Sequence, residues 1–174
     1  MIDRFKNWVF AVCFGLCGLS SFLGAEGVFD SIGKEVHDVF EGVKGSIVKV
    51  KSDNGVMMLT GSGFFIDGEG TVLTSSLIVV DDTATTVETE DGKWDARVLG
   101  KDLRSGIALL KVYGVKSKPL TFSAGNTLKA ASAVIGVGYP YNLPVAPSFG
   151  LVGGFDFQYL NKFFPTTHIR ANLP

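Results

Sequence analysis

The fold is decided by residues 61–74, which read GSGFFIDGEGTVLT. The first half, up to Asp67, is glycine-rich and apolar, and Thr71–Thr74 again carries the β-branched and apolar residues that strands favour. Between them, Asp67-Gly68-Glu69-Gly70 supplies residues that tolerate a positive φ. The stretch therefore predicts two β-strands joined by a tight turn.

Strand signals continue on both sides of this stretch. Apolar residues alternate with lysines near residue 49, and Asp91-Gly92 separates two alternating runs, which is a strong hairpin signal. Six strands are predicted between residues 46 and 113, about enough to close a small barrel. They are Ile47–Lys51, Met57–Asp67, Thr71–Thr74, Thr85–Glu90, Lys93–Leu99 and Ile107–Tyr113.

A second set of strands follows the linker Gly114–Pro119. It is predicted to contain Leu120–Ser123, Ala131–Val137, Pro147–Phe155 and Thr166–Leu173. Four strands in an open sheet leave an unpaired edge and an uncovered apolar face, so we expect the natural fold to need more chain than this. The fold class is all-β, with a first barrel over residues 45–113 and a partial second barrel over residues 114–174.

The first 25 residues have the layout of a secretory signal peptide. Arg4 and Lys6 form a charged head, Trp8–Leu23 is apolar or small throughout, and Gly24-Ala25 offers a cleavage point. The alternative is an uncleaved anchor over residues 8–23, although that run is short beside the about 20 residues that a spanning helix needs. The chain's two cysteines lie in this leader, so the mature protein is expected to form no disulfide.

An amphipathic helix is predicted within residues 26–44. Apolar residues from Val28 to Val43 recur at spacings of three and four, which is the period of a helix with one apolar face. His37 falls on the polar side of this helix, where a histidine is usually solvated.

Composition limits the classes of partner and ligand. Hydrophobic residues make up 46% of the chain and charged residues 19%, so it has the composition of a folding domain. The formal net charge of −1 gives no general attraction for nucleic acid or anionic lipid. With two cysteines, both in the leader, and two histidines, the sequence argues against a zinc site built on a Cys/His quartet, and no motif predicts a metal or a cofactor.

Four segments in register resemble HtrA-type trypsin-like serine proteases. The first is residues 61–74, the second is Gly100–Val112, and the third and fourth are Val134–Pro140 and Phe149–Val152. The resemblance covers residues 45–174 in the family's order and implies a chymotrypsin-like double β-barrel with an active-site cleft between the barrels. It also implies a Ser-His-Asp triad, in which the histidine takes the proton of the serine and the aspartate orients the imidazole.

The resemblance assigns each triad role to a position, and none is filled. The position of the histidine holds Leu77, and the position of the aspartate holds Gly106. The serine is expected about six residues beyond Pro174 by the family's spacing, so this chain does not supply it. Asp102 lies nearby, but the family has an aspartate there in addition to its catalytic one, and we interpret Asp102 as structural.

Other residues are candidates for a cleft or a partner surface. Ser75 and Ser76 precede Leu77 and are expected at the cleft edge or in a turn, and Asn172 stands where many family members carry an aspartate. Ser62 lies between two glycines, as nucleophilic serines often do, but it lacks the Gly-x-Ser-x-Gly motif. We therefore interpret it as a strand residue. The aromatic run from Phe155 through Phe157 and Tyr159 could line a peptide groove or pack under the second barrel.

The sequence therefore predicts an exported HtrA-like protein of the bacterial periplasm or cell envelope. We expect it to be proteolytically inactive and to bind a peptide or protein partner, with no nucleic acid and no membrane contact except through an uncleaved N-terminal segment. Two alternatives stay open: the N-terminal part of an envelope serine endopeptidase whose nucleophile lies beyond Pro174, and a plain structural β-domain. The sequence gives neither the partner nor the oligomeric state.

Overall fold

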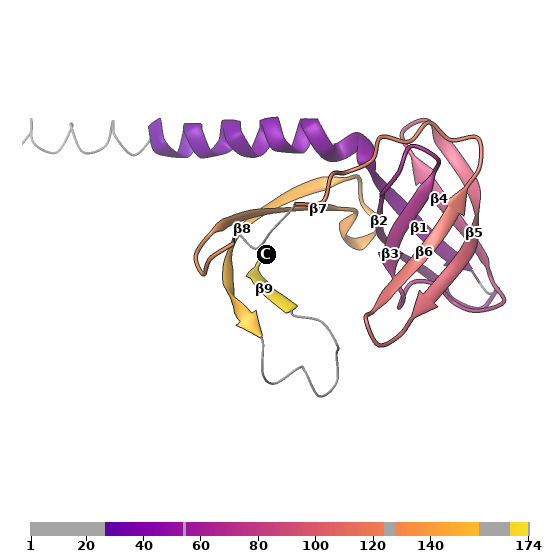
Figure 1. Ribbon diagram of the computed structural model, residues 1–174. Coiled ribbons are helices and arrows are strands. Elements are labelled where there is room, and N and C mark those ends of the chain that lie inside the picture. The colour runs from indigo at the N-terminus through magenta and orange to yellow at the C-terminus, as the bar shows by residue number, and fades with distance from the viewer. Residues whose placement is uncertain (1–26, 54, 124–127, 157–167, 174) are drawn as a thin grey trace, which may run out of the picture. The chain divides into compact units, whose positions relative to one another are not determined.

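The computed structural model describes residues 27–53, 55–123, 128–156 and 168–173 (Figure 1). The chain divides into two compact units, Met1–Val39 and Phe40–Pro174. A helix covers residues 27–43, as the spacing of apolar residues predicts. It begins in the first unit and ends at the start of the second. No helix among the described residues has both the length and the apolar character to cross a membrane.

Six strands of the second unit close into a barrel. Their order around the barrel is β1-β2-β3-β6-β5-β4, and every neighbouring pair is antiparallel. A short 3-10 helix, η1 (Lys44–Ser46), leads into the first strand. All six predicted strands are confirmed, as β1 (Ile47–Asp53), β2 (Met58–Phe65), β3 (Thr71–Ser75), β4 (Ala84–Thr89), β5 (Gly92–Asp102) and β6 (Ile107–Val112) (Figure 1).

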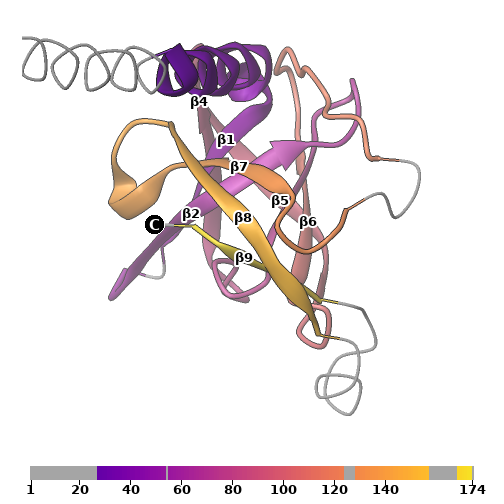
Figure 2. The ribbon, with the colours of Figure 1, turned by 90° about the vertical axis from the view of Figure 1, so that its left-hand side faces the viewer.

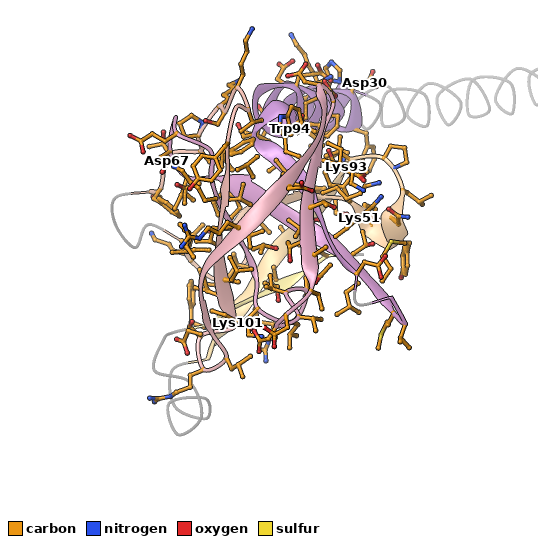
Figure 3. The ribbon with its side chains drawn as sticks, turned by 90° about the vertical axis from the view of Figure 1, so that its right-hand side faces the viewer. Asp30, Lys51, Asp67, Lys93, Trp94 and Lys101 are labelled. Atoms are coloured by element: carbon orange, nitrogen blue, oxygen red, sulfur yellow. The ribbon has the colours of Figure 1, made fainter. Side chains whose placement is uncertain are left out.

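The barrel forms because alternate residues of its strands are apolar and point inward. Val48 and Val50 of β1 are fully buried, while Lys51 points outward and its ammonium lies 2.9 Å from the Glu88 carboxylate of β4. Figure 3 labels Lys51 on the outer surface of the barrel, together with Lys93, whose ammonium lies 3.9 Å from the same carboxylate. Each fully buried valine or phenylalanine contributes about 1.5–3 kcal/mol by leaving water, so the interior residues stabilise the barrel far more than its surface ion pairs do.

Close approach of strands in the barrel requires glycine at position 63. A Cβ atom added to Gly63 would lie 2.9 Å from Val72 Cγ1 and 3.1 Å from Val50 Cγ2. Because these are buried atoms of the packed core, they have little room to move away. The glycine-rich start of residues 61–74 is therefore a packing requirement of the barrel interior.

The rest of the second unit is a three-stranded antiparallel sheet in the order β7-β8-β9. Its strands are β7 (Ala133–Gly138), β8 (Ala146–Asp156) and β9 (His168–Asn172), and the 3-10 turn η2 (Pro140–Asn142) follows β7 (Figure 2). The expectation of a complete first barrel and a partial second one is confirmed.

One predicted strand is wrong. Leu120–Ser123 has no strand partner, and its one backbone hydrogen bond outside regular elements runs from the Leu120 amide to the Phe65 carbonyl oxygen, at 2.9 Å. The exposed Phe122 instead packs edge-on against Phe64, with ring centroids 6.1 Å apart. Leu120 and Phe122 thus contact the end of β2 without forming a strand.

Candidate functional site

The turn after β3 carries the position at which the resembled family has its histidine. Leu77 is 79% exposed, and its amide donates a hydrogen bond of 3.3 Å to the hydroxyl oxygen of Ser75. Ser76 is buried beneath this turn, and its amide donates to the carbonyl oxygen of Gly106 at 2.9 Å. The fold therefore brings Leu77 and Gly106, the positions to which the resemblance assigns the histidine and the aspartate, to the same end of the barrel.

Gly106 closes the turn between β5 and β6 in a backbone conformation that suits glycine. Its φ is +76°, and its amide donates to the carbonyl oxygen of Asp102 at 3.0 Å. A Cβ atom added here would meet no other atom within 4 Å. The space into which a carboxylate would project from position 106 is therefore open.

Asp102 uses its carboxylate to hold the same turn. Its oxygens accept hydrogen bonds from the amides of Arg104, at 2.9 Å, and Ser105, at 3.3 Å. The side chain of Ser105 is the main cause that lowers the pKa of the Asp102 carboxyl, and the Arg104 amide adds to the effect. Asp102 thus has the turn-stabilising geometry of an Asx motif.

An apolar cavity of about 250 Å³ opens beside these residues. Apart from glycines, its wall consists of five apolar side chains and three hydroxyl-bearing ones. The apolar ones are Ile47, Phe64, Leu73, Ile107 and Val137, and the others are Ser62, Thr74 and Ser75. Gly106 also lines this apolar cavity, whereas Leu77 does not. Among the residues that the structure describes, no charged side chain lines it, so these residues give the wall no group that takes or gives a proton at neutral pH.

Ser62 joins the barrel to the segment after β7. Its hydroxyl oxygen accepts a hydrogen bond from the Tyr139 amide at 2.8 Å, and its carbonyl oxygen accepts one from the Thr74 hydroxyl at 2.9 Å. Lys49 makes a second connection, because its ammonium donates to the Asn142 carbonyl oxygen at 3.0 Å and lies 5.0 Å from the centroid of the Tyr139 ring. These contacts give Ser62 a structural role in the wall of the cavity.

The remaining candidate residues lie elsewhere. Phe155 is half-buried in β8, and Asn172 is exposed in β9, where it pairs with Leu151. Phe157 and Tyr159 fall outside the described residues, as does the side chain of His168, whose backbone belongs to β9. Within the described residues, no group of three His, Cys, Asp or Glu side chains could hold a metal ion.

Sequence reasoning singled out Ser75 and Gly106, which line the cavity, but missed most of the other residues of its wall. Ile47 and Val137 are separated by most of the two strand sets, so nothing in the sequence pattern signals that they line one cavity. Ile107 could have been predicted near the site, because it directly follows Gly106 in the sequence. Lys49 could be recognised only as an outward residue of an alternating strand.

Comparisons with known proteins match the observed fold. The trypsin-like peptidase domain family matches residues 61–171. A probable periplasmic serine endoprotease DegP-like from Brucella suis is 36% identical over 95 residues, which are 53% of this chain and 18% of that protein. The periplasmic serine endoprotease DegP from Escherichia coli K12 is 32% identical over 107 residues, which are 60% of this chain and 23% of that protein. The chain thus spans about a fifth of the length of these relatives.

A solved structure supports the same assignment at the level of the fold. The crystal structure of the serine endoprotease from Yersinia pestis superposes with a TM-score of 0.64 and 21% sequence identity. The match covers 68% of this chain and 44% of that one. With the closed six-stranded barrel, the partial second sheet and a family match over more than half of its length, this chain belongs to the trypsin-like peptidase domain family, with distant relatives among the DegP/HtrA serine endoproteases.

Proposed function

We propose that this chain is an exported pseudoprotease, which binds polypeptide without cutting it. The observation that carries this proposal is the pair Leu77 and Gly106 at the positions of the triad base and its orienting carboxylate. The hydrogen bond between Ser76 and Gly106 keeps the two turns next to each other, so both substitutions fall in a single site.

The chemistry of the residues at positions 77 and 106 argues against proteolysis. A serine hydroxyl attacks a peptide carbonyl only when a neighbouring base removes its proton, and the same base later protonates the leaving amine. The hydrocarbon side chain of Leu77 can neither accept nor donate a proton, and Gly106 has no side chain with which to orient an imidazole. Loss of a triad member typically leaves about 10³–10⁴-fold catalysis over water, which is a small remnant of protease activity.

The geometry beside Leu77 favours binding. The apolar cavity lies at the end of β3 and includes Val137 of β7, so its wall joins the barrel to the second sheet. Ligand sites are commonly concave and mostly apolar, with few polar groups. A polypeptide is the ligand that a protease fold is shaped to receive, and this supports binding as the retained activity.

Export is part of the proposal. The relatives from Brucella suis and Escherichia coli are named periplasmic, and the first 25 residues have the layout of a signal peptide. Fractionation of cells that express the chain should recover it in the periplasm or the envelope, with residues 1–25 removed. Recovery from the cytoplasm with an intact N-terminus would contradict export.

The second candidate function is the N-terminal part of a serine endopeptidase. It is favoured by the relatives, which are named serine endoproteases and are several times longer than the matched region. Isolation of the protein from its source separates the two candidates. A longer protein that hydrolyses casein would support the endopeptidase, and a protein of either length that leaves casein intact would support the pseudoprotease.

The proposed binding is tested with fluorescently labelled, unfolded casein. Titration with the 174-residue chain should raise the fluorescence anisotropy of the casein, while gel electrophoresis shows no fragments after prolonged incubation. Folded serum albumin serves as the control ligand. No rise in anisotropy at any concentration would contradict the binding activity.

A further inference from the structure

Helix 27–43 carries an apolar seam with the spacing of a coiled coil. The seam consists of five side chains, Phe29, Ile32, Val36, Val39 and Val43. They follow one another at alternating steps of three and four residues, so they take successive a and d positions of a heptad repeat. In coiled coils, side chains at these positions interdigitate with those of a second helix. The sequence of the helix therefore has the pattern of a pairing surface.

Much of this seam is open to solvent. The exposed fraction is 72% for Phe29, 39% for Ile32 and 46% for Val39, while Val36 and Val43 are half-buried. A row of exposed apolar side chains along one element marks a surface that another molecule covers.

Two glycines lie beside the seam, where they leave room for a partner. Gly33 follows the d residue Ile32, at an e position, and Gly42 precedes the a residue Val43, at a g position. Glycine in the middle of a helix is less favourable than alanine. A Cβ atom added at either glycine would meet no described atom within 4 Å, so packing within the described chain does not require glycine there. The free space beside the seam is therefore available to a second helix.

The charge of the helix argues against an anionic membrane surface as the partner. Residues 27–43 hold one lysine and four carboxylates, a net charge of −3 with His37 neutral. The charged residues are Lys34, Asp30, Glu35, Asp38 and Glu41. Amphipathic helices that bind anionic lipid carry lysine and arginine on the polar face instead. A second apolar seam is the better partner for this helix.

We propose that the seam pairs with the same seam of a second copy of this chain, in an antiparallel dimer with two-fold symmetry. In this dimer Ile32 lies opposite Val43 of the second copy, and Val36 lies opposite Val39 of the second copy. All of these layers consist of β-branched side chains. The inference goes beyond the proposed binding of polypeptide, and it does not depend on that function.

The residues that flank the seam select the antiparallel direction. Antiparallel helices bring e positions beside e positions and g positions beside g positions, so Phe40 faces Gly33 of the second copy and Glu35 faces Gly42 of the second copy. Large side chains then lie next to the free space at the glycines. In a parallel pair, g positions face e positions, and the Glu35 carboxylate would lie against the Phe40 ring of the second copy. An antiparallel pair shifted by one heptad would bring two Glu35 carboxylates together, and they would repel each other.

The length of the helix predicts a reversible dimer. Residues 27–43 extend over about 26 Å, which gives a small interface beside that of a permanent dimer. The fraction of dimer should therefore rise with protein concentration. The seam lies after residue 25, so the same pairing is expected whether or not the first 25 residues are removed.

Cysteine crosslinking on the full 174-residue chain tests the pairing and its direction. Cys13 and Cys17 are first replaced by serine, so that each variant has one cysteine, at Ile32→Cys or Val43→Cys. Two copies of Ile32 in the proposed dimer lie about 16 Å apart along the helices, whereas Ile32 and Val43 share a layer. A short bismaleimide should therefore join the mixed variants at least about tenfold more than it joins either variant to itself.

A matched pair of aspartate variants tests the seam with the same crosslink. Val39→Asp places a charge opposite Val36 of the second copy, where it would lose its hydration without gaining a partner, so the mixed crosslink should fall at least about tenfold. Val98→Asp is the control, because Val98 is a similarly exposed valine of the barrel, at 37% against 46% for Val39. It should leave the crosslink unchanged.

Each contrary outcome overturns a stated part of the inference. Self-crosslinking of Ile32→Cys as strong as that of the mixed pair would overturn the antiparallel direction, and no crosslinking at any protein concentration would overturn the dimer. Equal losses with Val39→Asp and Val98→Asp would show that association does not use the seam. The cysteine comparison needs neither aspartate variant, so it decides the matter even where one of them does not fold. None of these outcomes changes the proposed pseudoprotease function, which rests on positions 77 and 106.

Discussion

The amide nitrogen of Ser76 lies 2.9 Å from the carbonyl oxygen of Gly106, and the hydrogen bond between them joins the turn after β3 to the turn between β5 and β6. These two turns hold Leu77 and Gly106, the positions to which the family resemblance assigns the base and its orienting carboxylate. The junction forms although neither Leu77 nor Gly106 has a titratable side chain.

Restoring the two side chains should not restore proteolysis in the 174-residue chain. In Leu77→His/Gly106→Asp, the triad would still need a serine nucleophile and an oxyanion hole, which these changes do not supply. The φ of +76° at position 106 also strains the aspartate. Casein incubated with the double variant should remain intact, with the unaltered chain as the control. Fragments of casein that depend on the double variant would show that a nucleophile lies within these residues.

The barrel core should be sensitive to truncation of its largest buried side chain. Phe65 is fully buried among the inward residues of the barrel, so Phe65→Ala should lower the free energy of unfolding by about 3–5 kcal/mol. Phe122→Ala is the matched control, because Phe122 is 62% exposed and should cost much less. Urea denaturation followed by circular dichroism measures both. Equal losses in the two variants would contradict the assignment of the core.

Asp102 should make the free energy of unfolding depend on pH in the acidic range. Hydrogen bonding lowers the pKa of Asp102 in the folded state below its ordinary value of 3.8, so its contribution is present above pH 3.8 and is lost as the pH falls through the folded pKa. Asp102→Asn should therefore unfold at lower urea than the unaltered chain at pH 7, and this difference should shrink as the pH falls below 3.8. A difference that stays constant from pH 7 to strong acid would show that the carboxylate charge has no role.

Ser62 should control the connection between the barrel and the segment after β7. Ser62→Ala removes the acceptor of the Tyr139 amide, which costs about 1–3 kcal/mol where that amide is left without a partner. Hydrogen exchange at the Tyr139 amide should accelerate, while exchange at the core residue Val50 should stay slow. Ser123→Ala, at an exposed position, serves as the control. Unchanged exchange at Tyr139 would mean that another group holds this segment.

The barrel could be predicted from sequence because its signals are local. Val48 and Val50 alternate with lysines, and Asp91-Gly92 marks a hairpin, which the structure closes with the pair Thr89 and Gly92. The N-terminal helix was equally visible in the spacing of its apolar residues. These patterns carry their own periodicity, and no knowledge of distant contacts is needed to recognise them.

Features that depend on distant contacts could not be predicted. The alternation of residues 93–99 gives Val98 and Val87 the same side of the hairpin, but the register shifts between Val98 and Gly100, and Val98 is 37% exposed while Val87 is buried. The strand expected at Leu120–Ser123 failed for a similar reason, because a single hydrogen bond to Phe65 replaces a partner strand. Leu77 and Gly106 could be singled out from the sequence by the family resemblance, whereas the cavity beside Gly106 depends on residues from five strands and one turn.

Fluorophosphonate labelling tests the central claim most directly, because the reagent reacts only with a serine that a neighbouring base has activated. The protein isolated from its source is treated with the reagent and its intact mass is measured, with an active HtrA protease as the positive control. The absence of a base at Leu77 predicts no change in mass under conditions that label the control completely. A mass increase of one label, located by peptide mapping on a serine, would contradict the account.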